Sequence, residues 1–474
     1  MNASEKGWMR HRTSREKWQT VDRLEISMDL KDISLYVDDR PAEGVFRVHR
    51  DVYSDPELFE LEQKFIFERT WGFLALESQI GKPNDFVTGH IGRTPVLATR
   101  DAKGRVAAFV NVCRHKGAML CAAEEGNAKY HVCPYHGWAY DSSGKNVDVK
   151  DRKTGSYPAS FDAESHDLVP LAKVASYKGF VFGSLSPEVP PLEDFLGDMR
   201  FFIDVVADQG PRGVEFVPGR SVYTYRGNWK LQLDNGLDPY HLTTTHLSYM
   251  DLQARRRGGE GHLEARQYDW AKRNKADGGT FALAHGHAAT WLEQPEPEKR
   301  PIWPALAEIR ARVGELRAQW MLKARNVHVF PNMQIADAIT LMLRTFRPLA
   351  ADRTEMKSWC LAPVGEAPEL RAWRLRQFED FFNPGGLATP DDTVTYEGCQ
   401  SGFGAQPIAF LQGYSRGMAA IKQGADEAAA SIGIRPQASV RGPFEQFSEV
   451  GFHAPYREWA RLIQAGVAGK KAYP

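Results

Sequence analysis

The chain has 474 residues, enough for two or three domains and a sizeable hydrophobic core. Basic and acidic residues number 60 each, so the net charge is zero, and no long run of like charge recommends nucleic acid or a membrane surface as a partner. The first thirty residues are charged throughout, and no stretch approaches the roughly eighteen apolar residues of a membrane span, so we expect a cytoplasmic protein without a signal peptide.

The first half of the chain changes pattern near residue 72. Residues before about Pro41 are polar and irregular, whereas Asp55–Trp71 repeats Leu and Phe at helical spacing behind an aspartate that can cap a helix. From Gly72 to Ser186, short apolar runs alternate with Gly, Asn and Asp turns, which is typical of a small β-rich domain. We therefore predict an amphipathic helix that leads into this domain.

The second half, after the proline-rich joint at residues 186–195, mixes helical and alternating patterns. Long helices are predicted over Pro304–Lys323 and Pro368–Phe382, and an antiparallel hairpin over Ala338–Leu349 and Thr354–Pro363. The polar, charged segment Arg255–Asp277 is predicted to be a long mobile loop or lid. The expected division is an N-terminal segment (1–71) packing on the third domain, a β-rich domain (72–187) and a larger α+β domain with an antiparallel sheet (188–474).

Two short loops in the β-rich region have metal-binding spacing. Cys113 and His115 form a C-x-H motif, and seventeen residues separate them from the C-x-x-H motif of Cys133 and His136. Together the loops offer two thiolates and two imidazoles, which is the ligand set of a Rieske [2Fe-2S] cluster. The alternative is a structural zinc with two Cys and two His ligands, although one residue between ligands is unusual for zinc. The other cysteines, Cys121, Cys360 and Cys399, fit reduced thiols or small buried hydrophobes.

A second cluster of candidate ligands lies in residues 228–246. Asp234, Asp238 and His241 follow one another at helical spacing, but Pro239 interrupts the helix. His246 follows His241 by five positions, so a regular helix would point the two imidazoles about 140° apart. Both histidines can bind one metal only if the segment is distorted. A pair of histidines alone is weak support for a metal site, but a Rieske cluster transfers single electrons and needs a second site to use them, such as iron held by two His and one carboxylate.

These motifs resemble a known family. Cys-Arg-His-Lys-Gly at 113–117, Cys-Pro-Tyr-His-Gly-Trp at 133–138, and Asn-Trp-Lys followed by Tyr-His-x4-His at 228–246 resemble the large (α) subunits of Rieske ring-hydroxylating dioxygenases, nearest to the benzoate/toluate group. The resemblance extends from about Gly44 to His453. It implies a β-rich Rieske domain and a catalytic domain in which helices flank an antiparallel sheet, in a helix-grip-like arrangement.

The resemblance also assigns roles to individual residues. It implies that Cys113, His115, Cys133 and His136 hold the cluster and that His241, His246 and Asp392 hold iron. Asp238 matches an aspartate that bridges an iron-bound histidine to a cluster histidine of the neighbouring subunit, which is His136 by position. Asn235, Phe382 and Leu387 match pocket positions, whereas Asp234 stands where Glu is usual. From the residues alone, a helix cap formed by Thr389, Pro390 and Asp392 is favoured over a metal ligand.

The function implied is cis-dihydroxylation of a single-ring aromatic carboxylate with O₂. The chain has neither a G-x-G-x-x-G after a strand nor a C-x4-C-x2-C ferredoxin spacing, so NADH and flavin are expected on a separate ferredoxin-type reductase. The expected cofactors are one [2Fe-2S] cluster and one Fe(II) per chain, and the expected partner is a small β subunit in an α3β3 complex. Alternatives are a monooxygenase acting on a salicylate-, anthranilate- or aniline-like ring, and a Rieske electron carrier with a structural second domain.

Overall fold

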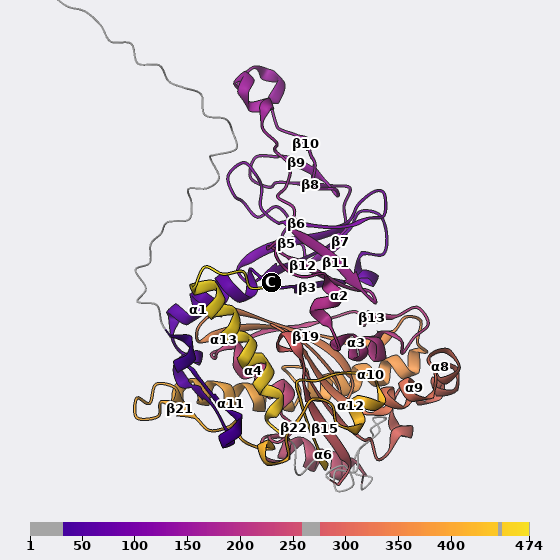
Figure 1. The fold of residues 1–474 in the computed structure, drawn as a ribbon. Coiled ribbons are helices and arrows are strands. Elements are labelled where there is room, and N and C mark those ends of the chain that lie inside the picture. Colours follow the sequence, from indigo (N-terminus) through magenta and orange to yellow (C-terminus); the bar gives the residue numbers. More distant parts are fainter. Residues whose placement is uncertain (1–31, 258–274, 444–447, 474) are drawn as a thin grey trace, which may run out of the picture.

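The computed structural model describes residues 32–257, 275–443 and 448–473. Figure 1 shows a β-rich module standing on a larger module built from a wide sheet and helices. Most of the segment predicted to be a lid, Arg255–Asp277, lies outside the described residues, as does most of the polar N-terminal stretch. None of the helices in the described part of the chain combines the length and apolar character that crossing a bilayer would require.

The N-terminal part packs on the larger module. Strands β1 (Val37–Arg40) and β2 (Val45–His49) pair with each other, and β2 also pairs with β21 (Phe410–Leu411). The predicted helix is confirmed as α1 (Pro56–Glu62), whose cap Asp55 accepts hydrogen bonds from the backbone N–H groups of Glu57 and Leu58. One π-helical turn, Gln63–Phe67, prolongs it, and its buried apolar residues pack against α13 (His453–Val467).

Three antiparallel sheets build the β-rich module, so the prediction for this stretch is confirmed. The first has the order β6-β5-β4-β7, the second β11-β12-β3 and the third β10-β9-β8. Their bounds are β3 Gly72–Leu76, β4 Asp85–Ile91, β5 Thr94–Arg100, β6 Val106–Val110, β7 Glu125–Asn127, β8 Tyr130–Val132, β9 Ala139–Asp141, β10 Asn146–Asp148, β11 Lys173–Tyr177 and β12 Phe180–Ser184. The third sheet lies at the tip of the module, away from the larger one (Figure 1).

A ten-stranded antiparallel sheet organises the larger module, as predicted. Its order is β13-β20-β19-β18-β17-β16-β15-β23-β22, and β14 pairs with β20. The strands are β13 Val214–Phe216, β14 Ser221–Tyr225, β15 Asp277–Ala282, β16 Ala288–Leu292, β17 Ala324–Val329, β18 Met333–Asp337, β19 Leu341–Ala350, β20 Arg353–Pro363, β22 Lys422–Gln423 and β23 Ala438–Pro443. The predicted hairpin is confirmed as β19 and β20, which pair from Met342↔Cys360 to Ala350↔Arg353.

Helices flank this sheet. One of the two long helices predicted from the sequence is confirmed. α10 (Pro368–Phe381) begins and ends as expected, but the predicted helix Pro304–Lys323 is wrong as a single element. It is divided into α8 (Leu306–Val313) and α9 (Glu315–Leu322), because Gly314 adopts a φ of 82° that a continuous helix excludes. The remaining helices are α2 Leu192–Leu196, α3 Met199–Ala207, α4 Trp229–Leu237, α5 Leu242–Thr245, α6 Leu247–Arg257, α11 Ala388–Gly402 and α12 Glu427–Ser431.

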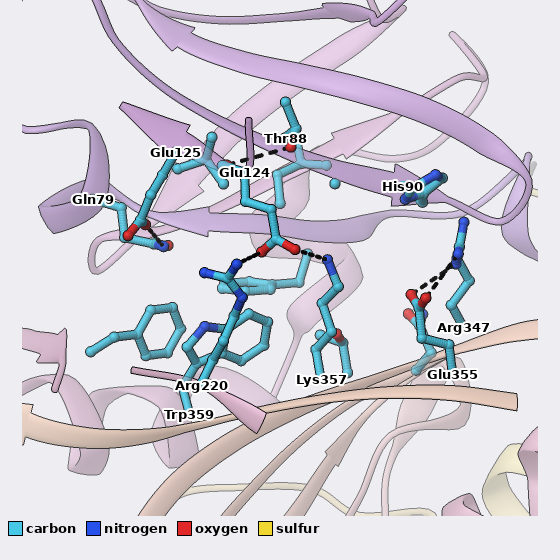
Figure 2. A pocket seen from close by; sticks show the side chains of 17 residues that line it. Gln79, Thr88, His90, Glu124, Glu125, Arg220, Arg347, Glu355, Lys357 and Trp359 are labelled. Carbon is cyan, nitrogen blue, oxygen red and sulfur yellow. Dashed lines mark hydrogen bonds and ion pairs between the residues drawn. The ribbon is translucent and has the colours of Figure 1, made fainter. Parts of the chain in front are cut away.

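Charged side chains fill the junction between the two modules (Figure 2). Glu124, beside β7, forms an ion pair with Arg220 and lies 3.9 Å from the ammonium of Lys357 on β20. His90 on β4 also lines the junction, where burial and the nearby charge of Arg347 lower its pKa to about 4, so the ring is neutral at pH 7. With these contacts in place, we propose that the expected division at residues 72 and 187 marks the β-rich domain.

Candidate metal centres

The two C-x-H and C-x-x-H loops fold into matching turns. In each turn the backbone N–H of a glycine four residues after the cysteine donates to the cysteine carbonyl, Gly117 to Cys113 and Gly137 to Cys133. Both glycines have φ near 75°, in the left-handed region where a side chain would be strained. The first loop follows β6 and the second joins β8 to β9, so two separate sheets hold them side by side.

The four side chains converge as two like pairs. The thiols of Cys113 and Cys133 are buried, and the Cys113 Sγ lies 3.4 Å from the Tyr140 hydroxyl. The imidazoles of His115 and His136 are only partly buried, and their Nδ1 atoms lie 3.0 Å apart. Trp138 stacks on the His115 ring at 5.0 Å between centroids. Two inner sulfurs and two outer nitrogens facing a common point fit a cluster with one iron held by Cys and one by His.

The second candidate site depends on a broken helix. α4 ends at Leu237, Asp238 has extended backbone (φ −99°, ψ 102°), and the chain resumes in α5 and α6. His241 precedes α5, and His246 lies between α5 and α6 with non-helical backbone. The distortion that the spacing requires is therefore present, and it turns both imidazoles toward the same point.

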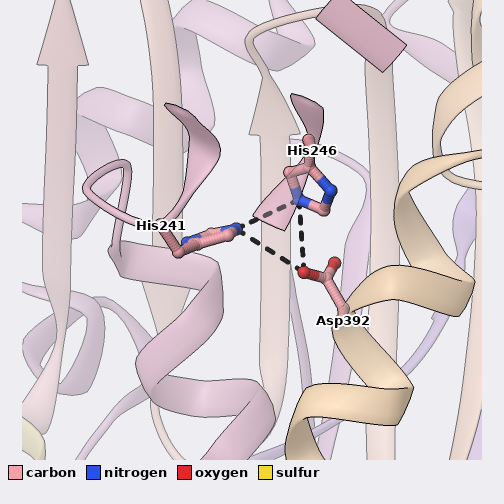
Figure 3. Close-up of side chains that lie close together, drawn as sticks. All are labelled: His241, His246 and Asp392. Atoms are coloured by element: carbon pink, nitrogen blue, oxygen red, sulfur yellow. Dashed lines mark hydrogen bonds and ion pairs between the residues drawn. The ribbon is translucent and has the colours of Figure 1, made fainter. Parts of the chain in front are cut away.

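His241, His246 and Asp392 form a compact triad (Figure 3). Asp392 Oδ1 lies 3.2 Å from His246 Nε2 and 3.5 Å from His241 Nε2, and the two Nε2 atoms are 3.2 Å apart. The three ligand atoms all lie within 4.8 Å of one another. Two imidazoles and one carboxylate that meet in this way fit the facial ligand set of mononuclear iron with open coordination positions.

Neighbouring polar groups orient the triad. Asp238 Oδ2 lies 3.3 Å from His241 Nδ1, and Asn235 Nδ2 donates to Asp392 Oδ1 at 3.0 Å. Asp391 Oδ2 lies 3.6 Å from His246 Nδ1, which is within ion-pairing range but too long for a hydrogen bond. The Asp238 carboxylate on the outer nitrogen of His241 favours the tautomer that presents Nε2 to a metal.

The electrostatics keep Asp392 ionised. Burial raises the pKa of this carboxyl, but the hydrogen bond with His246 and the charges of His241, His246 and Arg344 outweigh burial and hold the pKa below its usual value. The capping role that the sequence left open for this segment is wrong. α11 begins at Ala388 after Leu387, and the Thr389 hydroxyl donates to the Phe382 carbonyl instead of capping the helix.

Asp234 is not part of the triad, although it shares a helical face with Asp238 in the sequence. Its Oδ2 accepts hydrogen bonds of 2.9 Å from the hydroxyls of Tyr53 and Tyr456. Burial, with a smaller contribution from the charge of Asp238, raises its pKa to about 7 against the effect of these two hydrogen bonds. This buried carboxyl was not singled out as a titrating group from the sequence, because the tyrosines come from distant parts of the chain.

A cavity opens beside the triad, between α4 and the sheet. Phe382, expected from the sequence, lines it together with Asn235, whereas Leu387 packs in the adjoining apolar core. Asn326, Ile339, Arg344 and Phe381 also line it and were missed, because only the register of the sheet and the packing of α10 against it bring these residues to the triad. The signal in the sequence that could have pointed to Arg344 is a single arginine within the apolar run Leu341–Phe346.

Comparison with known protein families decides between these interpretations. Residues 216–465, more than half of the chain, match the family of ring-hydroxylating alpha subunits (catalytic domain), and residues 70–174 match the Rieske [2Fe-2S] domain. The chain belongs to the ring-hydroxylating alpha subunit family. It is an aromatic-ring-hydroxylating dioxygenase subunit that carries a Rieske cluster and a mononuclear iron, which sets aside the zinc alternative.

Individual relatives of this ring-hydroxylating subunit cover nearly its whole length. Toluate 1,2-dioxygenase subunit alpha of Pseudomonas putida is 42% identical, over 88% of this chain and 91% of the relative. The anthranilate 1,2-dioxygenase large subunit of Acinetobacter baylyi is 40% identical, over 92% of this chain and 93% of the relative. The structure of naphthalene 1,2-dioxygenase from a Rhodococcus species bound to indole matches with a TM-score of 0.75 and 27% identity, over 88% and 94% of the two chains.

Proposed function

We propose that this protein is the terminal oxygenase α subunit that cis-dihydroxylates a single-ring aromatic carboxylate. The observation that carries the proposal is the agreement among relatives, because those at 40% identity or more are named for toluate, 2-halobenzoate and anthranilate. All three are benzoates with one substituent. Relatives named for chlorobenzene, biphenyl and naphthalene are only 30–31% identical.

The ligand assignment follows the geometry. Cys113, Cys133, His115 and His136 would hold the [2Fe-2S] cluster, and His241, His246 and Asp392 would hold the iron. When bound, these groups supply single-electron transfer and activation of O₂. Asp238 holds the imidazole of His241 in one tautomer, and Asn235 fixes the carboxylate of Asp392 through its amide.

We further propose that electrons pass between subunits of an α3β3 assembly, from the side of His136 on one chain to Asp238 on its neighbour. Within one chain the β8–β10 sheet lies far from α6, at the other end of the molecule (Figure 1). Large apolar side chains are exposed beside both sites, namely Met119, Tyr130, Val132 and Tyr135 near the cluster loops and Tyr240 and Leu247 near the triad. Such patches are typical of surfaces covered by a partner.

The electrons would come from NADH through a flavin-containing, ferredoxin-type reductase, and the system would operate in the cytoplasm, where NADH is available. The relative named for anthranilate makes an amino-substituted ring the second candidate substrate within the same class. Monohydroxylation by the same metal sites is the alternative reaction.

The test is NADH-coupled oxygen uptake by the assembled protein with its reductase, across benzoates and their uncharged analogues, with products identified. The proposal predicts fastest turnover with a benzoate and a cis-dihydrodiol as product. Faster turnover of benzene or toluene than of every carboxylated ring would refute the substrate class.

A further inference from the structure

We propose that the guanidinium of Arg344 binds the carboxylate of the substrate. This inference rests on the proposed function and names the residue that would recognise the anion. A carboxylate transferred from water into a closed cavity without a cation or several hydrogen bonds would be strongly destabilised. An aromatic acid therefore needs such a group on the cavity wall.

Arg344 occupies the cavity wall by virtue of the sheet register. On β19 it pairs with Gln334 of β18 on one side and Ser358 of β20 on the other. Asn326 of β17 pairs with Ala336, two residues from Gln334, so Arg344, Ala336 and Asn326 share one face. That face is turned toward α4 and the triad, and all three residues line the cavity that His241, His246 and Asp392 also line.

The guanidinium carries a buried charge that lacks an ion pair. Arg344 is only 7% exposed, yet no carboxylate in the described part of the chain forms an ion pair with it. Its Nε donates to Gln334 Oε1 at 2.9 Å, and Gln232, with its amide oxygen turned toward the arginine, accepts from Nη2 at 2.8 Å. These neutral partners position the group without neutralising it, and the nearby carboxylate of Asp392 is assigned to the iron.

Other buried arginines of the same module differ in this respect. Arg325 on β17 and Arg300 both pair with Asp337, and Arg374 pairs with Glu366. The chain thus supplies carboxylate partners to buried guanidinium groups elsewhere. Arg344 is the buried arginine that faces the cavity, and an anionic ligand would complete its pairing.

The remaining cavity wall suits the rest of an aromatic acid. Ile339, Phe381 and Phe382 offer apolar and aromatic surface for a ring, and the Oδ1 atom of Asn326 is buried without a hydrogen-bond partner in the described structure. A carboxylate on Arg344 therefore leaves the ring between the phenylalanines and the triad. The unsatisfied Asn326 oxygen is positioned to accept a hydrogen bond from an amino or hydroxyl substituent.

The test compares a carboxylate with its neutral counterpart in Arg344→Gln. Steady-state kinetics are measured on the assembled protein with its reductase, using the benzoate that the wild type oxidises fastest and the corresponding primary amide. Losing a buried charge-assisted pair should lower kcat/KM for the acid by roughly 30-fold or more. The value for the amide should change by less than about threefold, since it depends on no charge. Titration calorimetry with the acid should show a parallel rise in Kd.

Arg347→Gln is the matched control, because this residue lies on the same strand but on the opposite face, paired with Glu355. It should leave the ratio of acid to amide turnover unchanged. If Arg344→Gln does not assemble, Arg344→Lys replaces it and should raise KM for the acid about tenfold, because lysine lacks the planar fork. Equal losses for acid and amide in the glutamine variant, or an unchanged KM for the acid in the lysine variant, would overturn the inference. If the wild type itself prefers the amide, the proposed substrate class fails as well.

Discussion

At the scale of single residues, the two cysteines proposed as cluster ligands are distinguished from the other thiols by the paired histidines beside them. Cys113 and Cys133 are buried beneath the paired histidines, whereas Cys399 is exposed on α11 and Cys360 lies in the core. The expectation of small buried hydrophobes therefore holds for Cys360 and fails for Cys399.

Replacing Cys113 with Ser should remove the visible absorption of the cluster and the oxygenase activity, because serine offers no thiolate to the buried iron. Iron content should fall by about two atoms per chain, since a [2Fe-2S] cluster is lost while the triad is untouched. Absorption spectra and metal analysis measure both effects, with Cys399→Ser as the control that keeps its cluster. A Cys113→Ser protein with an intact cluster spectrum would contradict the ligand assignment.

Asp234 predicts a pH dependence of stability. Its pKa is about 7 in the folded chain, above the ordinary value of 3.8, so the folded state holds a proton that the unfolded state releases. Stability from this group is thus present at acidic pH and is lost as the pH rises toward 7, by an amount on the order of a few kcal/mol. Asp234→Asn keeps an acceptor for both tyrosines and should flatten this loss. The melting temperatures of wild type and variant, measured from pH 5 to 8, should diverge, and parallel curves would exclude the role.

The role of a residue could be predicted from the sequence when its partners in the site lie close to it along the chain. The proposed ligands of the cluster lie in two short loops, so their spacing alone suggested them. Arg344 and the tyrosines around Asp234 could not be recognised, because sheet register and packing of distant segments bring them to their sites. Asp392 was assigned only through the family resemblance, since its local sequence favours a helix cap.

At the scale of elements, the interrupted α4–α5–α6 segment positions the two histidines of the proposed iron site. Pro239 predicted the interruption, and the structure has it. The division of the predicted Pro304–Lys323 helix at Gly314 was missed, because an isolated glycine within a helical pattern usually continues the helix.

Gly236, near the end of α4, permits the helix to approach the sheet closely. A Cβ there would overlap the side-chain amide of Gln334, the residue that holds Arg344. Gly236→Ala should therefore destabilise the fold by about 1–3 kcal/mol, as expected for overpacking. Denaturant unfolding measures the change.

Gly398 in α11 provides the control, since its Cβ would meet nothing within 4 Å. Gly398→Ala should be neutral or stabilise by up to about 1 kcal/mol through helix propensity. Equal effects of the two substitutions would show that the approach of α4 to Gln334 is not tight.

At the scale of the whole molecule, the way the β-rich module packs on the catalytic module determines the direction in which its cluster end faces. The Glu124 contacts with Arg220 and Lys357 span the junction (Figure 2), while the β8–β10 sheet lies at the end of the β-rich module away from the catalytic module (Figure 1). We therefore propose that a neighbouring chain completes the electron path.

Mixed assemblies test that path. Cys113→Ser chains lack the cluster and Asp392→Ala chains lack the iron site, so each should be inactive alone. Co-assembled in equal amounts, they should recover up to about a quarter of wild-type activity, because in a cyclic ring one contact in four joins an intact cluster to an intact iron site. Activity no higher than that of the separate variants would show that electrons stay within one chain.

The central claim is that both oxygen atoms of O₂ enter an aromatic carboxylate at this site. The most direct measurement is mass spectrometry of the product formed from a benzoate under ¹⁸O₂, with the assembled protein, its reductase and NADH. The account predicts two ¹⁸O atoms in a cis-dihydrodiol that keeps its carboxylate. A product with one ¹⁸O atom would identify a monooxygenase, and absence of labelled product from every benzoate tested would contradict the account.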